Sequence, residues 1–157
     1  MNRWLLIGLL SFFVAESSQA GLGETLEQAK GRYGSIVKQE QSEHLPQNEA
    51  GMMYEFNKDG FRIQIRLVGG KVAWILYIKD DGPIFESEIR TLLENNAEGS
   101  TWDNGAEVTD HRIYKKHIKF GRTDGLADAE YHEIGTYHGL GIITKAWRHA
   151  TSAASGL

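Results

Sequence analysis

A strict alternation of apolar and polar residues marks the centre of the chain as β-structure. Residues 61–68 read Phe-Arg-Ile-Gln-Ile-Arg-Leu-Val, the pattern of a strand with one buried face. Gly69 and Gly70 follow, and a glycine pair suits a two-residue hairpin turn because glycine readily accepts a positive φ. The turn therefore predicts a returning strand over 71–78, paired antiparallel with the first.

The same turn predicts which residues face each other across the hairpin. Paired residues lie on the same face of a sheet, so a row of apolar pairs indicates a buried face. The predicted pairs, each apolar on both sides, are Leu67 with Val72, Ile65 with Trp74, Ile63 with Leu76 and Phe61 with Ile78.

A further strand and a helix are predicted before this hairpin. Met52, Tyr54 and Phe56 alternate with other residues up to a turn sequence at 57–60, which adds a strand to form a three-strand meander. Thr25 and Gln28 fit a capping box, and Gly34 suits the residue after a helix, which predicts a helix over 26–33. Residues 38–51 contain a single large apolar residue and are expected to form a surface loop.

The region after the hairpin predicts a second helix and more strands. Apolar residues from Phe85 onward recur at helical spacing, which indicates a helix over 85–95 with Ser87 as a candidate cap. We expect three further strands within residues 112–120, 127–131 and 140–144.

These elements predict an α+β fold of two layers: helix, three-strand meander, helix and three further strands, with short helices packed on one face of an antiparallel sheet. The repeated order suggests two structurally similar halves, although no side-chain pattern repeats clearly between them. We expect a single domain over 21–150 and a frayed tail over 151–157, which is small and polar.

The first twenty residues have the features of a signal peptide. Arg3 provides a positive charge, residues 4–14 are almost continuously apolar, and Ser18-Gln19-Ala20 fits a signal-peptidase site. We predict cleavage after Ala20 and a periplasmic or secreted protein without a transmembrane segment in the mature chain. The alternative, an uncleaved anchor, is disfavoured because a membrane span needs about twenty apolar residues.

Composition excludes several classes of function. The formal net charge is −4, which argues against nucleic acid as a partner because phosphate backbones attract basic proteins. The sequence has no cysteine, which excludes thiol chemistry and cysteine-based metal sites. It also lacks the Gly-x-Ser-x-Gly motif of a serine nucleophile. We therefore expect a non-enzymatic protein without a cofactor.

The second face of the hairpin is a candidate binding surface. The predicted register places Arg62, Gln64, Arg66, Ile75 and Tyr77 together on this face, and arginine and tyrosine are enriched where proteins bind proteins. We expect this face to dock a protein partner; the alternative is that the helices or the second half of the chain bury it.

Histidine and glutamate near the C-terminus offer an alternative function. On a strand, Glu130 and His132 would project to one side, and His138 could return across a hairpin. Imidazole and carboxylate are zinc ligands, so these three residues suggest a small metal-dependent hydrolase. The other interpretation is a solvated polar face that binds no metal.

A basic segment stands out within the acidic chain, and a local positive potential could bind an anionic envelope polymer. Alternatively, its charges protect a strand edge from pairing with other chains. The segment comprises His111, Arg112, Lys115, Lys116, His117, Lys119 and Arg122.

The N-terminal half also resembles a known family. The sequence Gly-Glu-Thr-Leu-Glu-Gln-Ala at 23–29, the Tyr33-Gly34 pair, a polar loop and a Tyr-x-Phe strand are similar to the BamE-like (SmpA) group of small bacterial envelope proteins. Its layout is similar to the tandem halves of β-lactamase inhibitory protein. The resemblance covers residues 23–79 and implies an exported protein-binding adaptor or inhibitor of the bacterial envelope.

Overall fold

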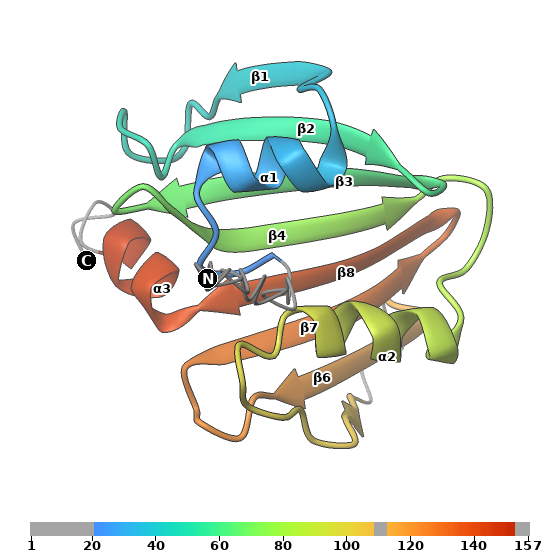
Figure 1. Ribbon diagram of the computed structural model, residues 1–157. Coiled ribbons are helices and arrows are strands. Elements are labelled where there is room, and N and C mark those ends of the chain that lie inside the picture. Colours follow the sequence, from blue (N-terminus) through green and yellow to red (C-terminus); the bar gives the residue numbers. More distant parts are fainter. Residues whose placement is uncertain (1–20, 109–112, 153–157) are drawn as a thin grey trace, which may run out of the picture.

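The computed structural model describes residues 21–108 and 113–152, which form an eight-stranded antiparallel sheet with three helices (Figure 1). The strands lie in the order β1-β2-β3-β4-β8-β7-β6-β5. Along the chain the elements are α1 (Leu26–Tyr33), β1 (Lys38–Gln41), β2 (Met52–Lys58), β3 (Phe61–Val68), β4 (Lys71–Lys79), α2 (Glu86–Asn95), β5 (Ala106–Glu107), β6 (Lys116–Gly121), β7 (Ala127–Ile134), β8 (Tyr137–Thr144) and α3 (Lys145–Ser152).

This architecture corrects the predicted fold class. The α+β description with a three-strand meander, three further strands and helices on one face was wrong, because the described residues form eight strands and place helices on both faces. The missed strands, β1 and β5, lie at the two edges of the sheet. Both are short and consist almost entirely of exposed residues, so they lack the apolar alternation by which a strand is recognised.

The described chain divides into two halves with the same order of elements, a helix followed by four strands. β1–β4 form one half of the sheet and β5–β8 the other, and the halves meet where β4 pairs antiparallel with β8. The predicted repeat of a helix and three strands therefore lacked one edge strand in each half.

α1 begins and ends at the predicted residues. The backbone N–H of Gln28 donates to Thr25 Oγ1 at 3.3 Å, and the N–H of Thr25 donates to Gln28 Oε1 at 2.8 Å, so both halves of the capping box form. Gly34 follows with φ 93°, and its N–H donates to the carbonyl of Lys30. A residue with a side chain would adopt this backbone conformation only under strain.

α2 begins one residue later than predicted and uses a different cap. Phe85, not Ser87, occupies the N-cap position. The Phe85 N–H donates to the carboxylate of Glu88 at 2.7 Å, and the same carboxylate accepts from Lys79 Nζ at 2.7 Å. Glu88 thus links the start of α2 to the end of β4.

The β3–β4 hairpin forms at Gly69 and Gly70, whose φ angles are 61° and 71°. Leu67 pairs with Val72 as predicted, but the register shifts by one residue before the next pair. The shift is a β-bulge, in which one strand contributes an additional unpaired residue, here Ala73 on β4. It makes three of the predicted pairs wrong: the observed pairs beyond the bulge are Arg66 with Trp74, Ile65 with Ile75, Gln64 with Leu76, Ile63 with Tyr77 and Arg62 with Ile78.

The bulge decides which residues of β4 enter the core. Successive residues of a strand face opposite sides of a sheet, so a shift of one residue exchanges the two faces. Ile75 and Tyr77 are 0% and 2% exposed and belong to the main core, whereas Trp74 and Leu76 face the other side and are half-buried.

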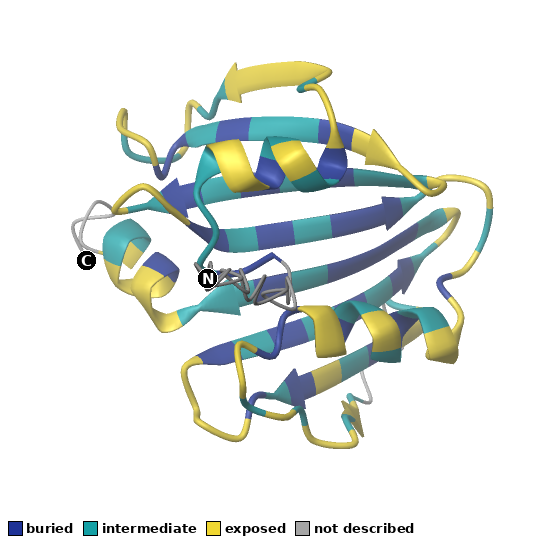
Figure 2. Cartoon of the chain, viewed as in Figure 1, coloured by how far each residue is buried: buried dark blue, intermediate teal, exposed yellow. Residues whose placement is uncertain are grey.

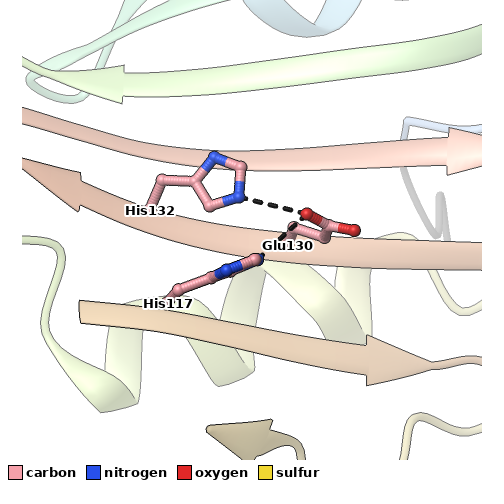
Figure 3. A group of neighbouring side chains, drawn as sticks. All are labelled: His117, Glu130 and His132. Atoms are coloured by element: carbon pink, nitrogen blue, oxygen red, sulfur yellow. Dashed lines mark hydrogen bonds and ion pairs between the residues drawn. The ribbon is translucent and has the colours of Figure 1, made fainter. Parts of the chain in front are cut away.

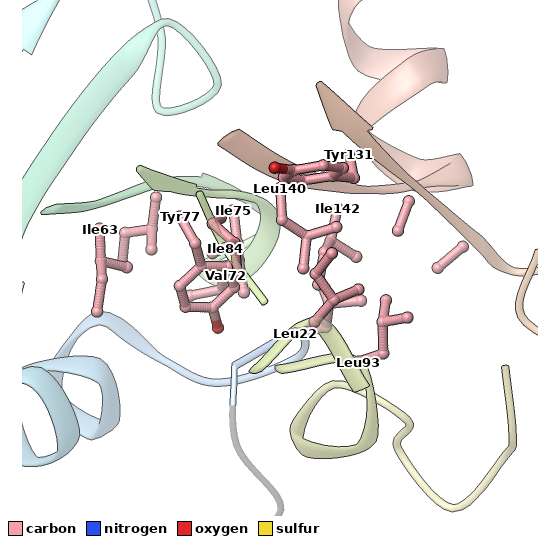
Figure 4. Packing of buried hydrophobic residues seen from close by; sticks show 14 of the residues in the cluster. Leu22, Ile63, Val72, Ile75, Tyr77, Ile84, Leu93, Tyr131, Leu140 and Ile142 are labelled. Carbon is pink, nitrogen blue, oxygen red and sulfur yellow. The ribbon is translucent and has the colours of Figure 1, made fainter. Parts of the chain in front are cut away.

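α1 and α2 cover one face of the sheet, and the main core lies beneath them (Figure 1). Burial alternates along the central strands as expected for a sheet covered on one side (Figure 2). Figure 4 shows how β3, β4, β7 and β8 and the segments near both helices contribute to this core, which includes Leu22, Ile63, Val72, Ile75, Tyr77, Ile84, Leu93, Tyr131, Leu140 and Ile142.

α3 packs on the opposite face, where the rings of Trp147 and Trp74 lie 6.2 Å apart. We call this face, which carries Gln64, Leu76, Gly141 and Glu130 in one row across the sheet, the open face. Beyond α3, the described residues place no helix on it.

The predicted frayed tail over 151–157 stays a prediction. Its first two residues, Thr151 and Ser152, form the end of α3, and residues 153–157 lie outside the described residues. The predicted signal peptide over 1–20 lies outside them as well. None of the described helices combines the length and apolar character needed to span a membrane.

Candidate metal centre

Two imidazoles and one carboxylate meet on the open face, at the pairing of β6 with β7. His117 lies directly opposite His132 in the register, and Glu130 precedes His132 by two residues on β7, which puts all three side chains on one face. Figure 3 shows both imidazoles directed at the same carboxylate.

The three groups lie close enough together to share an ion. Glu130 Oε2 lies 3.0 Å from His117 Nε2 and 3.1 Å from His132 Nε2, and the three candidate ligand atoms all lie within 4.8 Å of one another. Zinc ligands stand about 2.1 Å from the metal in a tetrahedron, which places them about 3.4 Å from each other. Small side-chain adjustments would therefore bring the three atoms around one ion.

The ionisation of the cluster favours a cation. Burial alone would raise the pKa of the Glu130 carboxyl, but hydrogen bonds with His117 and His132 outweigh burial and lower it. Burial lowers the pKa of the His132 imidazole, although Glu130 opposes this shift. At neutral pH the structure thus presents an ionised carboxylate and a neutral His132, the forms that coordinate metals.

Two neighbours shape the cluster. The ring of Tyr114 lies 4.7 Å from the His117 ring and 4.9 Å from the His132 ring, so it packs against both imidazoles and restricts their orientation. Lys119 Nζ lies 3.6 Å from Glu130 Oε1, which leaves the other carboxylate oxygen to the histidines. His117 Nδ1 is buried without a hydrogen-bond partner, so the ring is held through its Nε2 side.

The structure replaces one member of the predicted metal set. Glu130 and His132 meet as predicted, but His138 does not join them. His138 pairs with Glu133 across β7–β8, and both residues are buried on the helix-covered face. The prediction that Glu130, His132 and His138 share a site was therefore wrong, because β8 turns His138 to the side opposite Glu130.

His117 could have been found from the sequence. It belongs to the basic segment, whose charge gives no indication of a metal ligand. The turn sequence Arg122–Gly125 predicts a β6–β7 hairpin in which His117 shares a face with Glu130 and His132, by the argument applied to Gly69 and Gly70. The observed register is centred between Asp124 and Gly125 and puts His117 opposite His132. The contact with Tyr114 has no comparable signal, since it depends on how the segment before β6 folds back.

The predicted protein-binding face is divided between the two sides of the sheet. Arg62, Gln64 and Arg66 lie on the open face, whereas Ile75 and Tyr77 are buried in the main core. The prediction that all five share one surface was wrong because of the bulge at Ala73. The three polar residues are held by neighbours on the open face: Arg62 by Asp80 at 3.0 Å, Gln64 by Glu55 at 2.7 Å, and Arg66 by the Gly51 carbonyl and the ring of Trp74.

Acidic neighbours offset much of the basic segment. His111 and Arg112 lie outside the described residues, and Arg122 is buried rather than displayed. The structure gives ion pairs for Lys115 with Glu133 at 2.7 Å, Lys119 with Glu130 at 3.6 Å, and Arg122 with Asp124 at 3.0 Å. Binding of an anionic polymer stays a prediction.

No family model matches the sequence, and no curated protein matches it. The chain is similar to the crystal structure of an extracellular protein containing an SCP domain from Bacillus anthracis str. Ames, with a TM-score of 0.38 and 10% sequence identity. The match covers 85% of this chain and 48% of that one, so this chain spans about half the length of that protein. The resemblance of residues 23–79 to the BamE-like group stays a prediction.

Proposed function

We propose that the protein binds a divalent transition-metal ion through His117, Glu130 and His132. Zinc is the ion that we use to test this proposal. One observation carries this proposal: a single oxygen of Glu130 lies 3.0 and 3.1 Å from the Nε2 atoms of two histidines. Imidazole nitrogen favours zinc and similar metals, whereas calcium and magnesium prefer sites built from oxygen alone.

The ligand set leaves one coordination position open. Structural zinc sites are closed by four protein ligands, whereas the described residues supply three here, which leaves a coordination position for water or an external ligand. Two histidines and one glutamate with an open position also occur in catalytic zinc sites, but Glu130 would be a ligand here and would not be available as a general base. We propose binding of the metal and assign no reaction to the site.

We also propose that a protein partner docks on the open face. Arg62, Gln64 and Arg66 occupy the same open face as the metal cluster, because the register connects Gln64 through Leu76 and Gly141 to Glu130. A partner that docks on this face would reach both sets of residues. An exported adaptor or inhibitor of the envelope would use the face in this way.

Calorimetric titration with zinc tests the proposal, using chain purified without a polyhistidine tag. We expect one equivalent of Zn²⁺ to bind. The variants His117→Gln, Glu130→Gln and His132→Gln should each weaken binding by at least about 100-fold, because even loss of an outer-shell partner costs about 10- to 100-fold. At free zinc of about 100 times Kd, the wild-type chain should gain about 2.7 kcal/mol in unfolding free energy.

His149→Gln is the matched control, because His149 is exposed on α3, away from the cluster in the fold. It should bind zinc as the wild-type chain does. Circular dichroism without metal would establish that each variant is folded. Unchanged zinc affinity in folded His117→Gln and His132→Gln would contradict the proposal, as would the absence of binding in the wild-type chain.

A further inference from the structure

A cleft on the helix-covered face lies between the end of α1, the β2–β3 turn and α2. Its volume is about 410 Å³, within the range of about 300–1,000 Å³ typical of small-molecule sites. Its interior is largely apolar and aromatic: Phe61 packs edge-on against Tyr77 with ring centroids 6.3 Å apart, and Tyr33 and Leu92 form adjacent walls. The apolar part of a ligand fits such an interior.

The two tyrosines leave one hydroxyl hydrogen without an acceptor in the described structure. The side-chain nitrogen of Asn96 donates to Tyr77 Oη at 3.1 Å and to the Leu92 carbonyl at 2.7 Å. The hydroxyls of Tyr33 and Tyr77 lie 3.1 Å apart, and one can donate to the other. Burial raises the pKa of both phenols, so both keep their protons. The two phenols therefore add no charge to the lining of the cleft.

The rim of the cleft carries a cation held in place by the backbone. Lys58 Nζ donates to the Arg32 carbonyl at 2.6 Å, and the described residues give it no carboxylate partner. Two other charged groups at the rim are already neutralised, since Arg32 pairs with Glu24 and Glu88 pairs with Lys79.

Asp59 is the remaining charged group at the rim. It lies in the exposed β2–β3 turn next to Lys58, and the described structure gives its carboxylate no hydrogen bond that would hold it toward the cleft. Lys58, in contrast, is positioned before any ligand arrives. A fixed cation beside an apolar interior favours an anionic head group.

We propose that this cleft binds a small amphiphilic carboxylate, such as a medium-chain fatty acid, with the carboxylate at Lys58 and the apolar chain between Phe61 and Leu92. This site lies on the opposite side of the sheet from the metal cluster and goes beyond the proposed metal binding. The two sites are independent, because no residue contributes to both.

Calorimetry with decanoate and decyltrimethylammonium, both kept below their micelle-forming concentrations, tests the proposal. We expect decanoate to bind with one-to-one stoichiometry and more tightly than the cationic probe. Lys58→Met should weaken decanoate binding by about fivefold, the upper range for an exposed ion pair. Asp59→Asn should strengthen it, since asparagine suits the positive φ of 51° at this position and removes a negative charge.

Two further variants separate the cleft from the rest of the surface. Thr91→Trp places a large side chain at the mouth from the exposed side of α2 and should abolish binding. Lys71→Met removes an exposed cation from the first position of β4 and should change nothing. Equal decanoate affinity in the wild-type, Lys58→Met and Thr91→Trp chains would overturn the proposal. Tighter binding of the cationic probe would also overturn it, because Asp59 would then determine the preference.

Discussion

The two carboxylate oxygens of Glu130 contact different neighbours. Its Oε2 atom faces two imidazoles, while its Oε1 atom lies 3.6 Å from the ammonium of Lys119. Lys119 helps to keep the carboxylate ionised, which favours a metal, but its own positive charge repels one. Lys119 therefore has two opposite effects on the affinity of the cluster for a metal ion.

We predict that Lys119→Met increases zinc affinity by about twofold to fivefold. Lys119 is half-exposed, and an exposed charge at this distance changes an interaction by about 0.2–1 kcal/mol. Competition with a chromophoric chelator would measure the change. Lys30→Met, which removes a lysine from α1 on the other half of the molecule, should leave the affinity unaltered. A weaker zinc affinity in Lys119→Met would instead indicate that its support of Glu130 dominates.

At the scale of the element, the bulge in β4 has the largest effect on how the sequence is interpreted. Both Ile75 and Leu76 are aliphatic, and the predicted register assigned Leu76 to the core and Ile75 to a binding surface. The observed register assigns them the other way, with Ile75 fully buried and Leu76 half-buried on the open face.

We predict that Ile75→Ala lowers the unfolding free energy by about 2–5 kcal/mol, the cost of a cavity in a packed core. Leu76→Ala should cost clearly less, because the open face leaves room for the neighbouring groups to relax. Urea denaturation of both variants would measure the difference. A larger loss for Leu76→Ala would mean that the hairpin keeps the register without the bulge.

The start of α2 gives a prediction about pH. Burial tends to raise the pKa of Glu88, but Lys79 and the Phe85 N–H together lower it below its usual 4.5. A lowered pKa means that the folded state favours the charged carboxylate, so its contribution to stability is present above pH 4.5 and is lost as pH falls through the lowered value.

The wild-type chain should therefore exceed Glu88→Gln in unfolding free energy by about 1 kcal/mol at pH 7, and the difference should shrink below pH 4.5. Urea denaturation over a series of pH values would show this. Glu86→Gln is the matched control, because Glu86 is exposed in the same helical turn and should give a small difference that changes little with pH. A pH-independent difference for Glu88→Gln would contradict the assignment.

Local sequence patterns predicted most helices and strands, but they did not predict the edge strand β1 or the bulge in β4. The capping residues Thr25 and Gln28 located α1, and alternation located β2, β3 and β4. β1 reads Lys-Gln-Glu-Gln and becomes a strand only because β2 offers it hydrogen-bonding groups. The bulge at Ala73 leaves no local signal either, since the packing of the whole sheet selects it over the regular register.

At the scale of the whole molecule, the sequence indicated two halves but not how they join. The pairing of β4 with β8 connects residues about sixty to seventy positions apart, and no turn specifies such a contact. The metal centre shows the same division. Glu130 and His132 are close in sequence and were identified, whereas His117 is brought in by the β6–β7 hairpin.

The two proposed sites lie on opposite faces of the sheet. The metal cluster lies on the open face in the second half, and the cleft lies on the helix-covered face, between α2 and elements of the first half. The sheet between them is the shared scaffold, so a ligand at one site would not obstruct the other.

The edges of the sheet have a consequence for how molecules behave together. One edge is the four-residue β1, which carries charged and amide side chains, and the other is the two-residue β5. A growing fibril needs long, flat margins onto which the next chain can add its backbone. These margins are too short and too hydrophilic for such growth, so concentrated solutions of the folded chain should resist amyloid-like polymerisation.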